Sequence, residues 1–377
     1  MNLAKGHAAV NPPKKKKEKS SSTNKKEAST SIAAAYVPQS AADGACPLME
    51  AAFGINVGSG DFFMPGARIK NTTVGMPTKC MTAGQPTPAT DFIQNRFEME
   101  MLTMNQANRD LMWSESENAC GIKWNANAVS NIPDIYYPQQ LNTIPSLQHK
   151  NYAITGCTSG TGFYCAKAAI TKNANMVLLL NRHSDRATNA HNKLTEYKKE
   201  CNSNTIIYTV NCDLQSFESV KKCAPMVEAL CANSGGLDAL VNNAGIMGVP
   251  DTRTVDGFDV QMQTNHLSHF LLSYLLMPSL ELAADTRGEA RIVQHSSGAR
   301  SKDRATDLDT ATVPGMLKAE FFNQCEPGTL GGDDLPACFN RYHQTKLSNP
   351  VFTMALHDLL SKVNSKVKSI CAEPGKF

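Results

Sequence analysis

From about residue 148 onward, short apolar runs alternate with longer stretches whose apolar positions recur at helical spacing. This alternation is typical of a parallel sheet covered by helices on both faces. The predicted strands are Tyr152–Thr155, Met176–Leu180, Ile206–Val210, Leu237–Val241, Arg291–His295 and Val367–Ala372. The main helices are predicted at about Ser184–Cys201, Ser216–Ala232, Val255–Leu282 and Tyr342–Lys362. Right-handed crossovers wind these elements into an α/β fold, a Rossmann-type doubly wound parallel sheet.

The first 147 residues lack this alternation. Residues 1–35 are rich in Lys, Ser, Asn and Thr and can bury too little apolar surface to fold alone, which predicts a disordered tail. Residues 36–147 are rich in Gly, Pro, Met and Asn and show little periodicity. We expect an irregular N-terminal extension of unknown role, which packs against the domain formed by residues 148–377 or covers its cleft.

Composition changes this picture only slightly. Hydrophobic residues make up 41% of the chain and the net charge is +3, so no global field favours nucleic acid or an acidic membrane. The positive charge is local, at Lys14–Lys17, Lys19, Lys25 and Lys26. Such a run predicts a solvated tail; a nuclear address and an electrostatic tether are the alternatives.

Cysteine usage and apolar run length bear on the compartment. The twelve cysteines are scattered without a C-x-x-C pair, which predicts reduced thiols, as at Cys165 and Cys371, and neither disulfides nor a metal site. The longest apolar run, Phe270–Met277, is interrupted by Ser273 and is too short to span a membrane. No signal-peptide core precedes it. We expect a cytoplasmic protein, with organelle import left open.

A glycine-rich turn follows the first predicted strand and opens a helix. Gly156 permits the tight turn, Gly160 lets the backbone approach phosphates, and Gly162 allows close packing of helix and strand. The free N–H groups at the helix start can then bind the pyrophosphate of a dinucleotide. A generic turn is the alternative, but the placement favours a dinucleotide. The predicted contacts are Thr155, Gly156, Thr158, Ser159, Gly160, Thr161 and Gly162.

The cofactor is selected at the end of the second predicted strand. An acidic residue there binds the ribose 2′-hydroxyl of NAD(H), whereas an arginine accommodates the 2′-phosphate of NADP(H). Arg182 occupies this place, with no carboxylate before Asp185, so NADP(H) is favoured over NAD(H). Asp213, beside Leu214 after the third strand, is predicted to bind the adenine amine, to cap the next helix, or both.

Small residues follow the fourth predicted strand, at the carboxyl edge where open α/β sheets bind ligands. The tetrapeptide Asn242–Gly245 lets a cofactor pass close to the backbone at Asn243, Ala244 and Gly245. Asn265 lies inside a predicted helix, where asparagine is a poor former. Its presence suggests a task such as holding a relay water; a buried, hydrogen-bonded asparagine is the alternative.

Tyr342 and Lys346 are four residues apart and therefore share one face of a predicted helix. A free tyrosine titrates near pH 10, and an adjacent ammonium is expected to lower this pKa towards neutrality, as general acid–base catalysis requires. Ser297 ends the fifth strand and can hydrogen-bond a substrate oxygen beside Tyr342. Alternation along the strand means that only one of Ser296 and Ser297 faces the cleft.

Taken in order, these motifs resemble the short-chain dehydrogenase/reductase family over residues 151–375. The segments Val241–Met247, Thr264–Leu272 and Lys346–Asn349 are similar to the retinol-dehydrogenase-like branch, whose relatives include protochlorophyllide oxidoreductases and WW-domain oxidoreductases.

The resemblance implies an NADP(H)-dependent oxidoreductase acting on a carbonyl or hydroxyl carbon of an apolar retinoid-, steroid- or lipid-like substrate. Tyr342 would be the acid/base, and Lys346 would bind ribose and adjust the tyrosine pKa. Ser297 would orient the carbonyl and Asn265 would hold the relay water. Pro374 and Gly375 would contact the cofactor, and the helix carrying Tyr342 is a common dimer contact in this family.

Two departures from the family pattern bear on function. Tyr342 follows Ser297 by 45 residues, so a Gly-, Pro- and Asp-rich insert around Gly328–Asp334 is predicted to form a substrate lid or an exposed loop. The chain also stops at Phe377, where relatives continue with a substrate-binding segment. This predicts either a truncated product or an N-terminal extension that substitutes for the missing wall.

Two further functions compete with an enzyme. A non-catalytic NADP(H)-binding or interaction protein would keep the Rossmann half without a working pocket, and the chain end favours it. The Tyr342–Lys346 pair favours the enzyme, because a binding module needs no proton relay. The hypothesis of a nucleic-acid partner is supported only by the lysine run.

Overall fold

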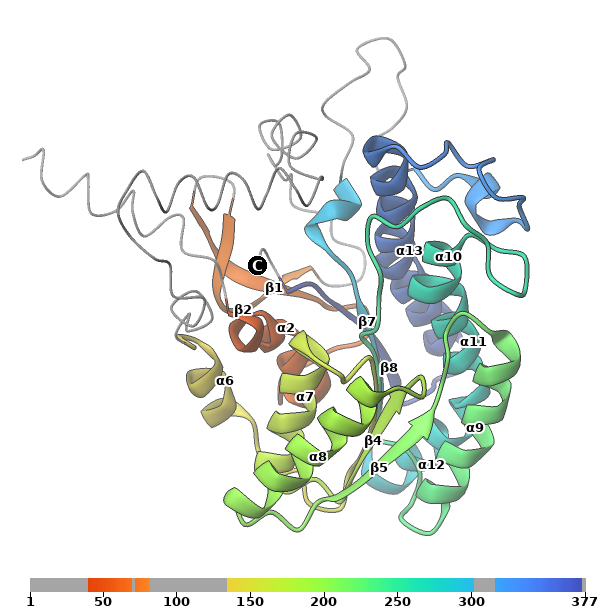
Figure 1. The fold of residues 1–377 in the computed structure, drawn as a ribbon. Helices are drawn as coiled ribbons and strands as arrows, with labels where there is room; N and C mark the ends of the chain where they lie inside the picture. Colours follow the sequence, from red (N-terminus) through yellow and green to blue (C-terminus); the bar gives the residue numbers. More distant parts are fainter. Residues whose placement is uncertain (1–39, 70–71, 82–133, 302–315, 375–377) are drawn as a thin grey trace, which may run out of the picture. The chain divides into compact units, whose positions relative to one another are not determined.

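The computed structural model describes residues 40–69, 72–81, 134–301 and 316–374, all within one compact unit. Its centre is an eight-stranded sheet in the order β2-β1-β8-β7-β6-β3-β4-β5 (Figure 1). Seven strands are parallel, and β2 pairs antiparallel with β1 at one edge. The strands are β1 (Phe62–Ile69), β2 (Thr72–Met81), β3 (Asn151–Thr155), β4 (Met176–Asn181), β5 (Ile206–Asn211), β6 (Ala239–Asn242), β7 (Ala290–His295) and β8 (Val367–Ala372).

The prediction of a Rossmann-type parallel sheet is confirmed. The six strands expected from apolar runs are β3 to β8, each within two residues of its predicted bounds. The strand order reverses between β3 and β6, which pair directly. A reversal of this kind opens a crevice at the carboxyl ends of the strands, where α/β sheets bind ligands.

Helices cover both faces of this sheet. They are α2 (Ala41–Phe53), α6 (Tyr137–Thr143), α7 (Gly160–Thr171), α8 (Asp185–Glu200), α9 (Phe217–Ala232), α10 (Val260–Met262), α11 (Ser268–Leu275), α12 (Met277–Arg287) and α13 (Leu335–Lys362). Alternation along the strands divides the apolar side chains between the faces: Tyr152 and Ile154 of β3 pack with α2, α6 and α7, whereas Ala153 packs with α9, α11 and α12. Two separate cores therefore hold the sheet rigid.

The expectation of an irregular extension is wrong for residues 40–69 and 72–81. Helix α2 is buried along most of its length and packs on α7, and β1 pairs in parallel with β8, Phe62 opposite Cys371. The Asp43 carboxylate accepts the backbone N–H groups of residues 135, 136 and 137, which ties α2 to the start of α6. The extension is thus part of the sheet and of one core.

The single long helix predicted at Val255–Leu282 is instead four segments. A π-helical turn, Gln263–Leu267, separates α10 from α11, and α12 begins anew at Met277 with Pro278 in its first turn. Proline is accepted there because the first helical N–H groups have no intrahelical partner. Within the ranges that the structure describes, no single helix is long and apolar enough to cross a membrane; only the pair Val260–Leu275 and Met277–Arg287, bent by 57°, reaches that composition together.

Several predictions fall outside the described residues: the disordered tail at 1–35, the part of the extension at 82–133, the insert at 302–315, and Gly375. The rest of the insert, 316–334, is largely exposed and contains one short 3-10 helix, Ala319–Phe322. Asp251 accepts the N–H groups of Leu330 and Gly332, so this part is an exposed loop fastened at its base.

Candidate active site

The glycine-rich turn joins β3 to α7 at the carboxyl edge of the sheet. Gly156 has φ +71°, and a Cβ there would lie 2.8 Å from the Ala244 Cα, so only glycine fits. A Cβ on Gly162 would lie 2.3 Å from the Asn243 side-chain nitrogen. Gly160, with φ +62°, has no heavy atom within 4 Å of that position, so the backbone is open to a ligand there. The separate roles predicted for Gly156, Gly160 and Gly162 agree with this geometry.

The start of α7 is arranged to accept an anion. Its N-cap residue, Ser159, makes no side-chain capping bond, and no acidic residue lies in the first turn. The first N–H groups of a helix are unsatisfied within the helix and carry a partial positive charge. With Gly160 open beside them, these residues fit the pyrophosphate of a dinucleotide. Thr158 lies in the same turn, between Gly156 and Ser159.

Asn243 fastens this turn to β6. Its side-chain nitrogen donates to the carbonyl oxygens of Thr155 (2.8 Å) and Gly156 (3.2 Å), and its side-chain oxygen accepts the Thr161 hydroxyl (2.7 Å). The Thr155 hydroxyl in turn accepts the N–H groups of Asn243 and Ala244. The two motifs therefore form one rigid unit across the β3–β6 crevice.

Tyr342, Ser297 and Lys346 meet at the neighbouring carboxyl end of β7. Tyr342 and Lys346 lie on α13, with the Lys346 ammonium 5.8 Å from the Tyr342 ring centroid. A hydrogen bond joins the Ser297 hydroxyl to Tyr342. Ser296 points elsewhere, since its buried hydroxyl donates to the Lys346 carbonyl. As predicted, only one of the two serines faces the tyrosine.

The expected sign of the Tyr342 pKa shift is wrong. Burial raises this pKa above 10, and the hydrogen bond with Ser297 lowers it by less. The Lys346 ammonium donates to the His295 carbonyl oxygen at 3.0 Å and lies 5.8 Å from the Tyr342 ring centroid. Desolvation disfavours the phenolate, so Tyr342 is a protonated donor at neutral pH.

Lys346 is buried at 5% exposure, and this burial lowers its pKa to about 8. Between about pH 8 and 10.5 the unfolded chain then binds more protons at this residue than the folded chain does, so its contribution to stability rises with pH. From about pH 7.5 to 9.5 we expect the free energy of unfolding to gain about 2 kcal/mol in the wild type relative to Lys346→Met. Chemical denaturation of both proteins at several pH values measures this gain.

The matched control is Lys193→Met, at an exposed lysine on α8. The difference in free energy of unfolding between Lys193→Met and the wild type should not change over the same pH range. A flat difference for Lys346→Met as well would contradict the lowered pKa.

Asn265 lies in the π-helical turn, and its side chain is hydrogen-bonded within the protein. Its oxygen accepts the Ile246 N–H (2.8 Å), and its nitrogen donates to the Ile246 carbonyl (2.8 Å) and the Thr345 hydroxyl (3.0 Å). This clamp holds the segment after β6, including Gly245, against α13. The arrangement is that of a buried, hydrogen-bonded asparagine, the alternative raised by the sequence; its role towards a relay water stays a prediction.

Comparison with known proteins agrees with this geometry. The family model for short chain dehydrogenases matches residues 150–306. Over these residues the chain is similar to short chain dehydrogenases. An uncharacterized oxidoreductase of Schizosaccharomyces pombe is 31% identical over 236 residues, 62% of this chain and 62% of that protein. Human polyprenol dehydrogenase is 30% identical over 227 residues, 59% of each.

Among solved structures, a protein from Mycobacterium paratuberculosis has 29% identity and a TM-score of 0.48, covering 62% of this chain and 71% of that one. The chain spans about three fifths of the length of the two curated relatives above.

The predicted cofactor selectors lie after the ends of β4 and β5. Arg182 is exposed directly after β4. Asp213 accepts the Gln215 N–H (3.0 Å), and Ser216, not Asp213, caps α9, so the capping alternative for Asp213 is wrong. Leu214 is buried, and its carbonyl accepts the Ser268 hydroxyl. Pro374 is buried after β8.

Three residues near the glycine turn were not predicted from the sequence. The Arg186 guanidinium donates to the Ser159 hydroxyl (3.2 Å), which brings a second cation to the glycine turn. His295 lies 2.9 Å from the Asn243 oxygen, and His269 lies 2.9 Å from the Thr155 hydroxyl. Burial lowers the pKa of each histidine to about 3, so both are neutral. No sequence signal points to this polar centre, because the partners of both histidines are remote from them in the sequence.

Proposed function

We propose that the protein is an NADP(H)-dependent oxidoreductase of the retinol-dehydrogenase-like branch, which reduces the carbonyl group of an apolar aldehyde or ketone. The observation that carries the proposal is the meeting of Tyr342 and Ser297 beside the β3–β6 crevice, where the glycine turn fits a dinucleotide. A similar human protein is named polyprenol dehydrogenase, and a polyprenol is an apolar alcohol, which supports an apolar substrate.

The residues of the chain supply the proton chemistry. Nicotinamide, when bound, supplies the hydride that reaches the carbonyl carbon. Ser297 donates a hydrogen bond to the carbonyl oxygen, and Tyr342 transfers its proton to that oxygen as negative charge develops on it. The raised pKa of Tyr342 keeps its hydroxyl protonated at neutral pH, so the proton is present to be donated. Lys346 is held by the His295 carbonyl beside Tyr342, in reach of a ribose.

The N-terminal extension can contribute to a substrate wall. Phe62 and Phe63 pair with the last two residues of β8, and β1 then runs on beyond the carboxyl end of β8. The β1–β2 ribbon therefore projects past the same sheet edge that carries the glycine turn (Figure 1). We include this ribbon in the proposal as one side of the substrate cleft.

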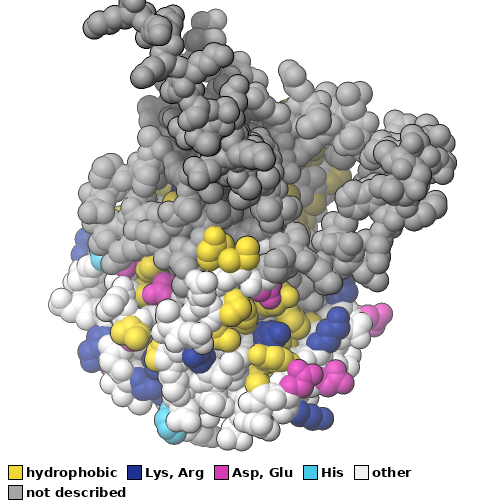
Figure 2. Space-filling model, turned by 90° about the vertical axis from the view of Figure 1, so that its left-hand side faces the viewer, with side chains coloured by type: hydrophobic (Ala, Val, Ile, Leu, Met, Phe, Trp, Pro, Cys, Tyr) yellow, Lys and Arg dark blue, Asp and Glu magenta, His cyan; other side chains and the backbone are white. Residues whose placement is uncertain are grey.

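The test is NADPH oxidation by the full 1–377 chain in the presence of retinal and long-chain aldehydes. Turnover supports the enzyme. Stabilisation by NADPH without turnover on any carbonyl would favour the alternative, a non-catalytic NADP(H)-binding protein. Nucleic acid has less support: on the face in Figure 2, Lys and Arg are interspersed with Asp and Glu around apolar side chains. A cytoplasmic location and a homodimer through α13 stay part of the proposal.

Cofactor selection gives a second, independent test. Because Arg182 is exposed after β4, Arg182→Asp should weaken NADPH binding by about tenfold or more and leave NADH binding nearly unchanged. Thermal unfolding titrations with each cofactor measure both dissociation constants, since a ligand at 100 times its Kd adds about 2.7 kcal/mol to the folded state. Arg186→Asp is the companion variant, because Arg186 lies at the same edge. If the ratio of the NADPH and NADH dissociation constants were unchanged in both variants, selection of NADPH by these arginines would be refuted.

A further inference from the structure

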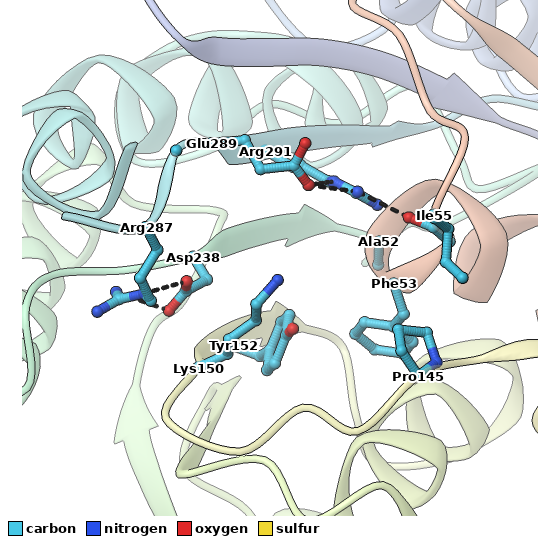
Figure 3. Close-up of a pocket in the computed structure, with 12 residues that line it drawn as sticks. Ala52, Phe53, Ile55, Pro145, Lys150, Tyr152, Asp238, Arg287, Glu289 and Arg291 are labelled. Carbon is cyan, nitrogen blue, oxygen red and sulfur yellow. Dashed lines mark hydrogen bonds and ion pairs between the residues drawn. The ribbon is translucent and has the colours of Figure 1, made fainter. Parts of the chain in front are cut away.

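A cavity of about 480 Å³ lies at the amino ends of the central strands. Lys150, Asp238 and Glu289 directly precede β3, β6 and β7, and all three line it. Its opposite side is formed by the end of α2 and the residues that follow (Figure 3). The dinucleotide turn and Tyr342 lie at the carboxyl ends of the same strands. A five-residue parallel strand spans about 17 Å, so the cavity is separate from the candidate active site at the carboxyl edge of the sheet.

Most charges in this cavity are already paired. Arg287 binds Asp238, with Nε–Oδ1 2.6 Å, and three backbone carbonyls. Arg291 binds Glu289 and the carbonyls of Ala51 and Gly54. The guanidinium groups of Arg287 and Arg291 therefore line the cavity but already have protein partners.

Two polar groups remain, Lys150 and Tyr152. Among the described residues, neither the Lys150 ammonium nor the Tyr152 hydroxyl has a hydrogen-bond partner, and Figure 3 shows both directed into the cavity. Tyr152 as a whole is only 2% exposed, and its hydroxyl faces the cavity. Burial raises the pKa of Tyr152, which keeps the hydroxyl protonated and able to donate to a ligand.

The remaining lining is apolar. Phe53 packs edge-on against the Tyr152 ring at 5.0 Å, and Ala52, Ile55 and Pro145 continue this surface. The lining side chains carry three positive and two negative charges, so one positive charge, that of Lys150, is in excess. One cation and one hydroxyl donor beside an apolar wall suit a single carboxylate attached to a hydrocarbon body.

We propose that this cavity binds an organic monocarboxylate with an apolar body, its carboxylate on Lys150 and Tyr152 and its hydrocarbon on Phe53 and Ile55. The ligand would join the end of α2 to the strands of the sheet, away from the cofactor edge. The inference is independent of the proposed reaction.

The probe is sodium octanoate, titrated calorimetrically into the full 1–377 chain. We expect saturable binding at one site, at least tenfold weaker binding of uncharged 1-octanol, and weaker binding of inorganic phosphate. Saturating NADPH should leave octanoate binding unchanged. No saturable binding at millimolar octanoate overturns the proposal. Displacement by NADPH also overturns it, because octanoate would then occupy the cofactor cleft.

The variants separate charge from folding. Lys150→Met should weaken octanoate binding about tenfold or more, Lys150→Arg should largely restore it, and Lys193→Met on α8 should leave it unchanged. Ile55→Glu places a carboxylate on the apolar wall at a residue that is 69% exposed, so the chain should fold and lose octanoate binding. Equal affinity in the wild type, Lys150→Met and Ile55→Glu would overturn the proposal.

Discussion

Tyr342→Phe is expected to lower kcat/KM for carbonyl reduction by at least about 100-fold while leaving NADPH binding nearly unchanged. The hydroxyl is the proton donor in the proposed reaction, hydrogen-bonded to Ser297 and kept protonated by burial. The phenylalanine ring fills the same space on α13, so packing is preserved. Steady-state kinetics and an NADPH titration on the same preparation measure the two quantities.

Tyr274→Phe is the matched control, since Tyr274 is 72% exposed on α11, away from the β7 end. This variant should keep wild-type kinetics. Equal turnover in Tyr342→Phe and the wild type would remove Tyr342 from the mechanism, and with it the proposed function.

Leu48→Ala should destabilise the whole protein by about 2–5 kcal/mol, the range for a leucine deleted from a packed core. Leu48 is 1% exposed in α2, among side chains that also include residues of β3, β4 and β7. If residues 40–69 folded independently of the sheet, shortening the Leu48 side chain would affect only local structure. Urea unfolding followed by far-UV circular dichroism measures the global free energy.

Ile55→Ala is the control within the same segment, at a side chain 69% exposed, and should change stability by less than about 0.5 kcal/mol. A similarly small effect for Leu48→Ala, or a separate early transition, would show that α2 is not part of the cooperative unit.

Strands β3 to β8 were predictable because the sequence pattern that specifies them is local. Val177 to Leu180 form an apolar run between polar turns, and the glycine turn after β3 has requirements that only glycine meets. The meeting of the three predicted site residues was predictable for a similar reason: spacing of four on a helix brings Tyr342 and Lys346 together, and Ser297 closely follows the neighbouring strand β7.

The place of β1 was not predictable from its own residues. Pro65 and Gly66 lie inside this strand, and both disfavour strands in local patterns. The segment pairs with β2 along most of its length, and its place in the sheet comes from the pairing of Phe62 and Phe63 with β8, which is remote in the sequence. The broken helix at 263–267 likewise depends on contacts of Asn265 with Ile246 and Thr345, which no local pattern contains.

The electrostatics of the site were the least predictable part. The sequence suggested that Lys346 would lower the Tyr342 pKa, but a spacing says nothing of burial or of where an ammonium points. In the folded protein Lys346 donates to the His295 carbonyl, and desolvation governs both groups. The neutral histidines His269 and His295 were missed because their partners, Thr155 and Asn243, come from other strands.

The pairing of β1 with β8 also dictates an order of events on the ribosome. Phe62 is made 309 residues before its partner Cys371. At about 5–20 residues per second, the emerging α2 and β1 wait about 15–60 s for the strand that completes their edge of the sheet. During that interval α2 can already pack on α7, but β1 has only β2 as a paired neighbour, so the inner edge of the β1–β2 ribbon is among the last parts of the sheet to be paired.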